Sequence, residues 1–342
     1  MKQFYLIMML FFAIASGATA QTTDIASIMQ KAEAGDATAQ NELGNIYSEG
    51  KGVSKNFTEA IKWYRKAAEQ GYADAQSNLG RCYFKGEGVT KDATEAVKWY
   101  TKAAEQGNSN AQFNLGNSYY NGEGVNKDFK EAVKWYTKAA VQGDSDAQFN
   151  LGNSYYYGEG VNKDFKEAVK WYTKAAEQGN SNAQFNLGNS YYYGEGVNKD
   201  FKEAVKWYTK AAEQGDSDAQ TKLGLSYQFG HGVEKNFTEA VKWYKKAAEQ
   251  GDAKAQAYLA DCYYQGKGVK KNLTEAVKWN RKAAEQENAQ AQCNLAFFYK
   301  NGIGMEKNLT KAKELYIKAA EQGDKVAQEY LKSNFNLDIQ KK

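Results

Sequence analysis

The chain repeats its own sequence every 36 residues. Residues 144–179 and 180–215 are identical except at two positions, where Asp is replaced by Asn. The dipeptide Ala-Gln recurs at the same interval from Ala39 onward, and all seven tryptophans occupy one slot of the repeat. Periods of this length are typical of stacked supersecondary units. The sequence is therefore predicted to form one repeat array rather than two or three unrelated globular domains.

Each copy contains two helical patterns separated by a glycine turn. In the third copy, Ala111, Leu115 and Tyr119 fall on one face of a helix, which we name helix A. Gly122 and Gly124 follow, at positions where positive φ angles are needed to reverse the chain. The first half of each copy is thus predicted to be an amphipathic helix that ends in a tight glycine turn.

The second pattern, named helix B, begins with an acidic cap. Asp128 is followed by Glu131, an arrangement that satisfies free backbone N–H groups at a helix start. Gly143 marks the end of the helix, whereas Glu287 occupies that position in the seventh copy, which predicts a less sharply ended helix there. The apolar stripe that predicts one buried face comprises Ala132, Trp135, Tyr136, Ala139 and Ala140.

Stacking of the copies follows from their size. A single helical hairpin cannot bury both of its helices, so copies must pack on one another and the ends of the stack need caps. The expected organisation is a signal peptide over 1–20, an N-terminal capping helix over 21–35, eight repeats over 36–323 and a C-terminal capping helix over 324–342. The eight repeats are 36–71, 72–107, 108–143, 144–179, 180–215, 216–251, 252–287 and 288–323.

The first twenty residues differ from the repeats. Lys2 precedes an apolar run from Phe4 to Ile14, and Ala18-Thr19-Ala20 matches a signal-peptidase site. This pattern predicts an exported protein, periplasmic or secreted, and favours a bacterial source. No later apolar run is long enough to span a bilayer, so no membrane span is expected. The formal net charge of +4 gives no electrostatic footprint for nucleic acid, which we do not expect as a partner.

The consensus AQxxLGxxYxxGxGVxKDxxEAxKWYxKAAEQG resembles the Sel-1-like repeat, a relative of the tetratricopeptide repeat. The resemblance covers nearly all of the chain after the predicted signal peptide. It implies an all-α fold, a right-handed α-solenoid superhelix of helix-turn-helix repeats with a 36-residue period. It also implies a role as an adaptor that holds other proteins, in bacteria often outside the cytoplasm.

Few residues suit catalysis, and we expect no catalytic, cofactor-binding or metal-binding residue and no enzyme activity. His231 is the only histidine and lies in a turn without a neighbouring nucleophile pattern. No Cys or His pair has zinc-ligand spacing. Cys82 and Cys262 occupy the same slot of distant repeats, and Cys293 occupies another. The three cysteines are therefore predicted to be small, partly buried helix residues without a disulfide.

Two further patterns each have two interpretations. The pairs Asp144/Asp146 and Asp216/Asp218 would suit calcium, but they precede helix A, where Asp is an ordinary cap, and we favour the cap. Four N-x-T sequences would be glycan acceptors in a eukaryotic secretory pathway. Their asparagines also fall on the helix B cap, which we favour, and they are Asn56, Asn236, Asn272 and Asn308.

The face of helix A opposite its core stripe remains for binding. In each central copy a Phe, an Asn and a Tyr lie there, and stacking would align them in rows. The resemblance places helix A on the concave side, so the rows are expected to line a groove. Tyr and Asn suit an interface, whereas packing between neighbouring A helices is an equal alternative for the Phe row. The predicted partner-binding residues are Phe113, Asn117, Tyr120, Phe149, Asn153, Tyr156, Phe185, Asn189 and Tyr192.

The leading functional hypothesis is an exported protein-protein interaction scaffold that holds segments of other proteins in this groove, without a cofactor. Binding of cell-wall polymer or another carbohydrate is the alternative. Binding or hydrolysis of β-lactams, linked to cysteine-rich relatives, is a remote third hypothesis. Those relatives carry a disulfide in each repeat, which this chain lacks together with the S-x-x-K and K-T-G motifs. The sequence does not identify the partner.

Overall fold

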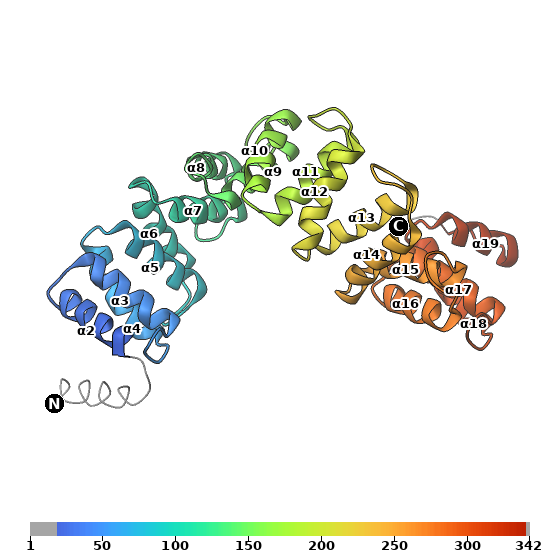
Figure 1. Cartoon of the computed structure of the whole chain (residues 1–342), viewed down its shortest axis with the longest axis horizontal. Coiled ribbons are helices and arrows are strands. Elements are labelled where there is room, and N and C mark those ends of the chain that lie inside the picture. The colour runs from blue at the N-terminus through green and yellow to red at the C-terminus, as the bar shows by residue number, and fades with distance from the viewer. Residues whose placement is uncertain (1–18, 340–342) are drawn as a thin grey trace. The chain divides into compact units, whose positions relative to one another are not determined.

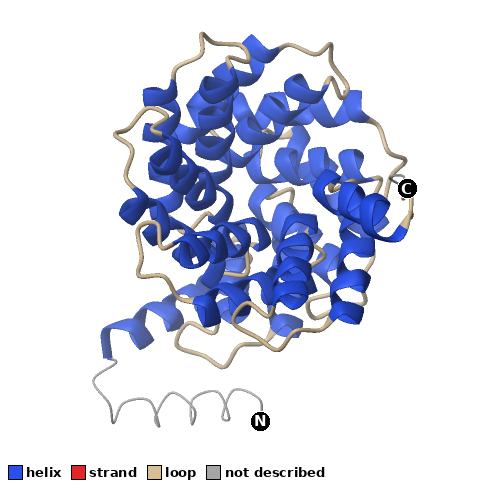
Figure 2. Cartoon of the chain, turned by 90° about the vertical axis from the view of Figure 1, so that its right-hand side faces the viewer, coloured by secondary structure: helices blue, strands red, loops and turns tan. Residues whose placement is uncertain are grey.

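The computed structural model describes residues 19–339, and every regular element in this range is an α-helix (Figures 1 and 2). The most extensive contacts join helices that are consecutive in the chain, from α2 to α19. The predicted all-α fold of paired helices with a 36-residue period is confirmed. Residues 1–18, which hold most of the predicted signal peptide, lie outside the described residues.

The chain divides into two compact units, one ending at Trp171 and one beginning at Tyr172, within α10. The first unit begins with α2 (Thr19–Glu33). Its A helices are α3 (Ala37–Glu49), α5 (Ala73–Lys85), α7 (Ser109–Asn121) and α9 (Ser145–Tyr157). Its B helices are α4 (Phe57–Glu69), α6 (Ala93–Glu105), α8 (Phe129–Val141) and α10 (Phe165–Glu177), the last of which continues into the second unit.

The second unit continues the same alternation. Its A helices are α11 (Ser181–Tyr193), α13 (Ser217–Phe229), α15 (Ala253–Gln265) and α17 (Ala289–Asn301). Its complete B helices are α12 (Phe201–Glu213), α14 (Phe237–Glu249), α16 (Leu273–Glu285) and α18 (Leu309–Glu321). The final helix, α19 (Lys325–Phe335), packs on α18 and buries Ala327 and Leu331.

Side-chain caps start both helices of most copies, whereas α5 begins after Tyr72, which makes no side-chain cap hydrogen bond. Asp128 accepts a hydrogen bond from the backbone N–H of Glu131 at the start of α8 (3.1 Å). Asp144 and Asp216, considered above as calcium ligands, accept from backbone N–H groups at the starts of α9 and α13, which confirms the cap interpretation. The asparagines of the four N-x-T sequences are likewise N-caps of B helices: Asn56, Asn236, Asn272 and Asn308.

The turn between the two helices requires its glycines. Gly122 and Gly124 have φ angles of 77° and 76°, as the sequence predicts. A Cβ atom on Gly124 would also lie 2.2 Å from the backbone oxygen of Ala93, at the start of the preceding B helix. The second glycine is therefore needed both for its conformation and for the close approach of neighbouring copies.

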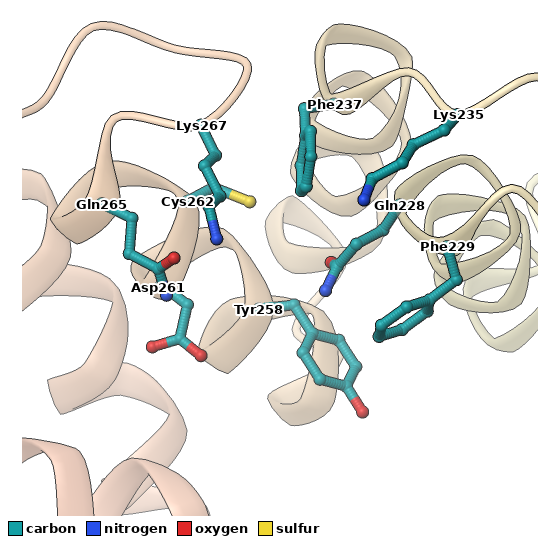
Figure 3. Close-up of a pocket in the computed structure, with 9 residues that line it drawn as sticks. All are labelled: Gln228, Phe229, Lys235, Phe237, Tyr258, Asp261, Cys262, Gln265 and Lys267. Atoms are coloured by element: carbon teal, nitrogen blue, oxygen red, sulfur yellow. The ribbon is translucent and has the colours of Figure 1, made fainter.

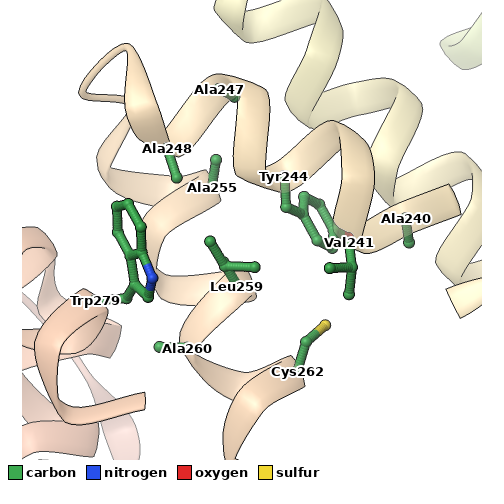
Figure 4. Close-up of a cluster of buried hydrophobic side chains, with 10 residues drawn as sticks. All are labelled: Ala240, Val241, Tyr244, Ala247, Ala248, Ala255, Leu259, Ala260, Cys262 and Trp279. Carbon is green, nitrogen blue, oxygen red and sulfur yellow. The ribbon is translucent and has the colours of Figure 1, made fainter. Parts of the chain in front are cut away.

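The hydrophobic core consists of clusters that neighbouring copies share. In the cluster of Figure 4, Tyr244 and Ala247 come from α14, Leu259 from α15 and Trp279 from α16. The cluster thus buries side chains of one B helix against the A helix that follows it and against the tryptophan of the next B helix. The same arrangement surrounds Leu115 in the first unit. Because each cluster needs two copies, an isolated repeat lacks a complete core.

Within a copy, helices A and B approach closely at one glycine. A Cβ atom on Gly116 of α7 would lie 2.6 Å from the ring of Tyr136 on α8. The ring is 1% exposed and has little room to move away. Alanine replaces this glycine in the last two copies, and in the seventh the tyrosine is replaced by the smaller Asn280.

Buried glutamines join successive B helices. Gln112 in α7 donates from Nε2 to the carbonyl oxygen of Ala104 at the end of α6 (3.0 Å). Its Oε1 accepts from Nε2 of Gln142 at the end of α8 (2.7 Å). One side chain of helix A therefore connects the ends of two B helices. The arrangement recurs at Gln40/Gln70, Gln76/Gln106, Gln184/Gln214, Gln220/Gln250, Gln256/Gln286 and Gln292/Gln322.

The seventh B helix ends as sharply as the others, so the expectation drawn from Glu287 was wrong. Glu287 adopts a φ of 62°, in the region that glycine occupies in the other copies. Its N–H bonds to Ala284 O and the N–H of Asn288 bonds to Ala283 O, each at 3.1 Å. The same two bonds close the third copy at Gly143. Packing of the next copy imposes the turn, and a residue with a Cβ adopts it at a cost of about 1–2 kcal/mol.

Replacing Glu287 with glycine is expected to stabilise the second unit. The variant Glu287→Gly should raise the free energy of unfolding by about 0.5–1 kcal/mol, because glycine reaches this φ without strain. Gly251→Ala, at the same slot of the preceding copy, is the matched control. No atom lies within 4 Å of its added Cβ, so backbone strain alone should lower stability. Denaturant unfolding of the full chain measures the stability of both variants. A Glu287→Gly variant no more stable than the parent chain would contradict backbone strain at Glu287.

Deleting one whole period should shorten the array without unfolding it. Removal of 144–179 joins Gly143 to Asn180, a Gly-Asn junction of a kind the chain already contains. Because each copy packs on its neighbours, helicity per residue should be retained. Removal of 144–161 instead fuses one helix B to the start of another and should cause aggregation or early melting. Circular dichroism and size-exclusion chromatography distinguish these outcomes, and equal damage in both variants would contradict a nearest-neighbour array.

Candidate functional site

The nine predicted partner-binding residues lie on α7, α9 and α11, and all are half-buried. The Phe row packs within its own copies. The ring centroids of Phe113 and Tyr136 are 6.2 Å apart, and those of Phe185 and Tyr208 are 6.0 Å apart. These phenylalanines therefore contribute to the core as well as to the surface. The three residues on α9 also have contacts within the chain: Phe149, Asn153 and Tyr156.

The asparagine row forms hydrogen-bonded groups that we term amide triads. Oδ1 of Asn117 accepts from the hydroxyl of Tyr136 in the same copy (2.7 Å) and from Nδ2 of Asn150 on the next A helix (3.2 Å). One acceptor thus serves two donors and is held in place by both. Asn45 accepts in the same way from Tyr64 and Asn78 (2.8 and 3.3 Å), and Asn189 accepts from Tyr208 (2.8 Å).

The tyrosine row reaches toward the turn of the following copy. The hydroxyl of Tyr120 donates to Oε2 of Glu159 (2.8 Å). Burial, followed by this carboxylate, raises the pKa of Tyr120 to about 12. In the second unit the hydroxyl of Tyr192 lies 3.0 Å from Nδ1 of His231, which also stacks on the ring of Phe201. The single histidine therefore takes the structural place of a glutamate.

The aromatic rings that end three of the A helices are exposed and were not predicted from the sequence. Tyr157 is 64% exposed, Tyr193 54% and Phe229 56%. Each is the last residue of its A helix, immediately before the turn glycine. Asn121 and Lys85 occupy this slot in other copies, so the core does not require an aromatic residue there. That variation was the signal in the sequence, because a slot that tolerates lysine is open to solvent.

A polar groove of about 520 Å³ lies over α3, α5 and α7 in the first unit. Neutral amides dominate its walls, with one basic side chain, Arg81, and two acidic ones, Glu49 and Asp74. Such a surface offers hydrogen-bond donors and acceptors with little apolar area. The remaining lining residues are Asn41, Asn45, Ser77, Asn78, Asn108, Asn110 and Asn114.

The second unit has a smaller pocket of about 200 Å³, lined from α13, α15, the turns after them and the first residue of α14 (Figure 3). Phe229 and Tyr258 give it an aromatic side. Asp261 takes the slot of the triad asparagine and accepts from Nδ2 of Asn294 (3.2 Å). Burial raises the pKa of Asp261, and Lys267 partly opposes the shift. Position 261 of the second unit thus carries a carboxylate in the slot where Asn45 and Asn117 of the first unit carry a neutral amide.

The cysteines lie on A helices and are buried and unpaired, as predicted. Burial raises the pKa of Cys82 and Cys262 to about 11 and that of Cys293 to about 12, so the thiols stay protonated at neutral pH. Across the described residues, no three His, Cys, Asp or Glu side chains are grouped as metal ligands. Among the helices described here, none has the length and apolar character needed to cross a membrane.

The Sel1 repeat sequence model matches the chain eight times, over residues 37–72, 73–108, 109–144, 145–180, 181–216, 217–252, 253–288 and 289–324. The chain belongs to the Sel1 repeat family. A solved Sel1 repeat protein from Oxalobacter formigenes is 36% identical with a TM-score of 0.67, covering 95% of this chain and 92% of that one. The match to the family confirms the resemblance stated from the consensus.

Similarity to Escherichia coli proteins is also found for this Sel1 repeat chain. The crystal structure of c5321, a protective antigen of uropathogenic strains, shares 43% identity with a TM-score of 0.84, covering 92% of this chain and 68% of that one. The secretory immunoglobulin A-binding protein EsiB is 40% identical over 69 residues. That segment spans 20% of this chain and 14% of EsiB.

Loss of a triad acceptor should destabilise the first unit. Asn117→Leu leaves the hydroxyl of Tyr136 and Nδ2 of Asn150 without their shared acceptor. The free energy of unfolding is expected to fall by about 1–3 kcal/mol, the usual cost of an unsatisfied buried polar group. Thermal and denaturant unfolding measure the change, and an unaltered stability would show that the triad does not hold the helices together.

The sixth copy supplies the matched control. Leu225 occupies the asparagine slot there, and the hydroxyl of Tyr244 donates instead to Oε1 of Gln228 (2.7 Å). The double variant Asn117→Leu/Tyr120→Gln gives the third copy the same pair and should recover part of the lost stability. A double variant less stable than Asn117→Leu would contradict this exchange of acceptors.

Proposed function

We propose that this chain is an exported, non-enzymatic scaffold that binds extended segments of partner proteins on the A-helix face of its units. The observation that carries the proposal is the combination, on that face, of amides fixed in triads with exposed aromatic rings. Amides pair with both the N–H and the C=O groups of a peptide backbone. Exposed tyrosines supply rigid apolar area with a polar tip, a composition typical of protein interfaces.

The nine predicted residues would form the half-buried base of this surface. Phe113, Asn117 and Tyr120 represent their pattern in the third copy. The exposed rings of Tyr157, Tyr193 and Phe229 add side chains that a partner can cover without disturbing the core. Repetition of similar side chains within a unit would let one extended segment make several modest contacts in series, whose free energies accumulate through linkage.

The relatives favour a protein as partner. EsiB is named for binding secretory immunoglobulin A, and its similarity to this chain supports proteins over small molecules as the class of ligand. Export is part of the proposal and depends on the signal-peptide pattern of residues 1–20. A partner would then be met in the periplasm or outside the cell.

Site-specific photo-crosslinking in the source organism tests the proposal. A photoreactive amino acid at Tyr157 or Tyr193 should capture the same proteins reproducibly, whereas one at the exposed B-helix residues Lys130 or Lys202 should not. The triple variant Tyr157→Ala/Tyr193→Ala/Phe229→Ala should reduce capture about tenfold or more, because exposed aromatic residues carry much of the energy of interfaces. Mass spectrometry identifies the captured proteins.

Capture that is equal from both faces would contradict the A-helix surface. Unchanged capture by the triple variant would do the same, provided its circular dichroism spectrum matches that of the parent chain. Sedimentation with purified peptidoglycan separates the carbohydrate alternative. If the parent chain pellets with peptidoglycan, the triple variant does not, and no protein is crosslinked, carbohydrate binding would replace the scaffold proposal.

A further inference from the structure

One amide triad has no acceptor at its centre. In the second copy Arg81 occupies the slot held by Asn45 in the first copy and Asn117 in the third. The two donor slots are still filled, by Tyr100 on α6 and Asn114 on α7. A guanidinium group has five N–H donors and no acceptor. Neither the hydroxyl of Tyr100 nor the side-chain amide of Asn114 makes a hydrogen bond with another described residue.

Arg81 is itself incompletely paired. Its Nε is buried and has no hydrogen-bond partner within the described part of the chain. The acidic residues of the same groove are engaged elsewhere, since Glu49 pairs with Lys51 and Asp74 accepts from Nδ2 of Asn108 (2.6 Å). An unsatisfied buried donor costs about 1–3 kcal/mol, and more when it is charged. A replacement of Asn by Arg that costs stability calls for a compensating role.

The site opens to the amide-lined groove of the first unit. Arg81 lines it together with Asn78 of the same helix α5, and Asn114 lines it together with Asn110 of α7. Tyr100 is 2% exposed and is not among the residues that line the groove, but it is close enough to Arg81 for that positive charge to act against the burial that raises the pKa of Tyr100. Two donor groups, one of them fully charged, thus line a solvent-accessible groove, and the hydroxyl-bearing Tyr100 is buried close to the charged one.

We propose that Arg81, Tyr100 and Asn114 form a carboxylate-binding site for the partner polypeptide. The carboxylate would come from an Asp or Glu side chain or from a chain terminus. This inference rests on the proposed function and assigns a chemistry to one position of the bound segment. An ionised carboxylate accepts about four hydrogen bonds, enough for a bidentate guanidinium and two neutral donors.

Charge favours a carboxylate over a phosphate group. Arg81 contributes one positive charge, which a carboxylate balances. A phosphate monoester carries about two negative charges at neutral pH. It would meet the carboxylates of Glu49 and Asp74 in the same groove with no second cation among the lining residues. A carboxylate meets the same two acidic groups with half of that charge, so repulsion opposes its binding less.

Three variants separate binding from folding. Arg81→Asn restores the triad acceptor of the neighbouring copies and should raise stability while it abolishes carboxylate binding. Arg81→Lys keeps the charge without the planar fork and should bind about tenfold more weakly or worse. Asn117→Arg recreates the arrangement in the third copy, where Tyr136 and Asn150 supply the donors, and should add a second site.

Nuclear magnetic resonance of the Arg81 Nε–H group in the full chain detects occupancy directly. The probes are the acetylated and amidated peptide Ala-Ala-Glu-Ala-Ala, its Gln counterpart, acetylated penta-alanine with a free carboxyl terminus, and inorganic phosphate. The Glu peptide or the free terminus should shift the resonance in a saturable way, and the one with the greater effect identifies the source of the carboxylate. The Gln peptide should bind at least about tenfold more weakly.

Equal shifts with the Glu and Gln peptides, or a saturable shift with phosphate alone, would overturn the assignment. Unchanged peptide binding to Arg81→Asn would also overturn it. If crosslinks at Tyr157 and Tyr193 capture a partner while no peptide shifts Arg81, the scaffold function stands and the carboxylate site falls. Peptide binding at Arg81 without crosslinked partners supports the carboxylate site and removes the exposed aromatic rings from the proposed binding surface.

Discussion

The stack depends on the buried glutamine that connects the ends of two successive B helices. Gln112 is buried and makes one bond to the preceding copy and one within its own. The same copies share a core in which Leu115 and Trp135 pack on the preceding B helix. A correctly placed neighbour is therefore required for polar pairing and for apolar burial at the same time. This coupling explains why Ala-Gln and Trp keep their spacing where surface residues vary.

Much of the fold was predictable from the sequence because its determinants are local. Helical geometry and the hydrogen-bonding needs of the backbone are enough to predict the cap at Asp128 and the turn at Gly122. They also predict the buried stripe that contains Trp135 and Tyr136. Glu287 was misjudged for the opposite reason. Its positive φ is imposed by the next copy, and a preference for glycine of about 1–2 kcal/mol is smaller than the packing that overrides it.

The candidate site was less predictable, because exposure depends on side-chain direction across several helices. Phe113 was predicted for the binding face with core packing as an equal alternative, and its half-buried ring contacts that of Tyr136. Tyr157, one position beyond the predicted row, is the exposed ring. The replacement of Asn by Arg at position 81 is visible in the sequence. Its meaning is not, because the two donors that lose an acceptor lie on other helices.

The amide triads also bear on how readily this surface can change its ligand. Asn117 is already held by two hydrogen bonds before any partner arrives. Ordering a free side chain on binding costs about 0.5–1.5 kcal/mol. Amides fixed by the fold avoid most of that loss of rotamer freedom, but they cannot turn to suit a different arrangement of donors and acceptors. Changes in specificity should therefore arise by substitution within single copies, as at position 81, while the adjoining copies keep their geometry.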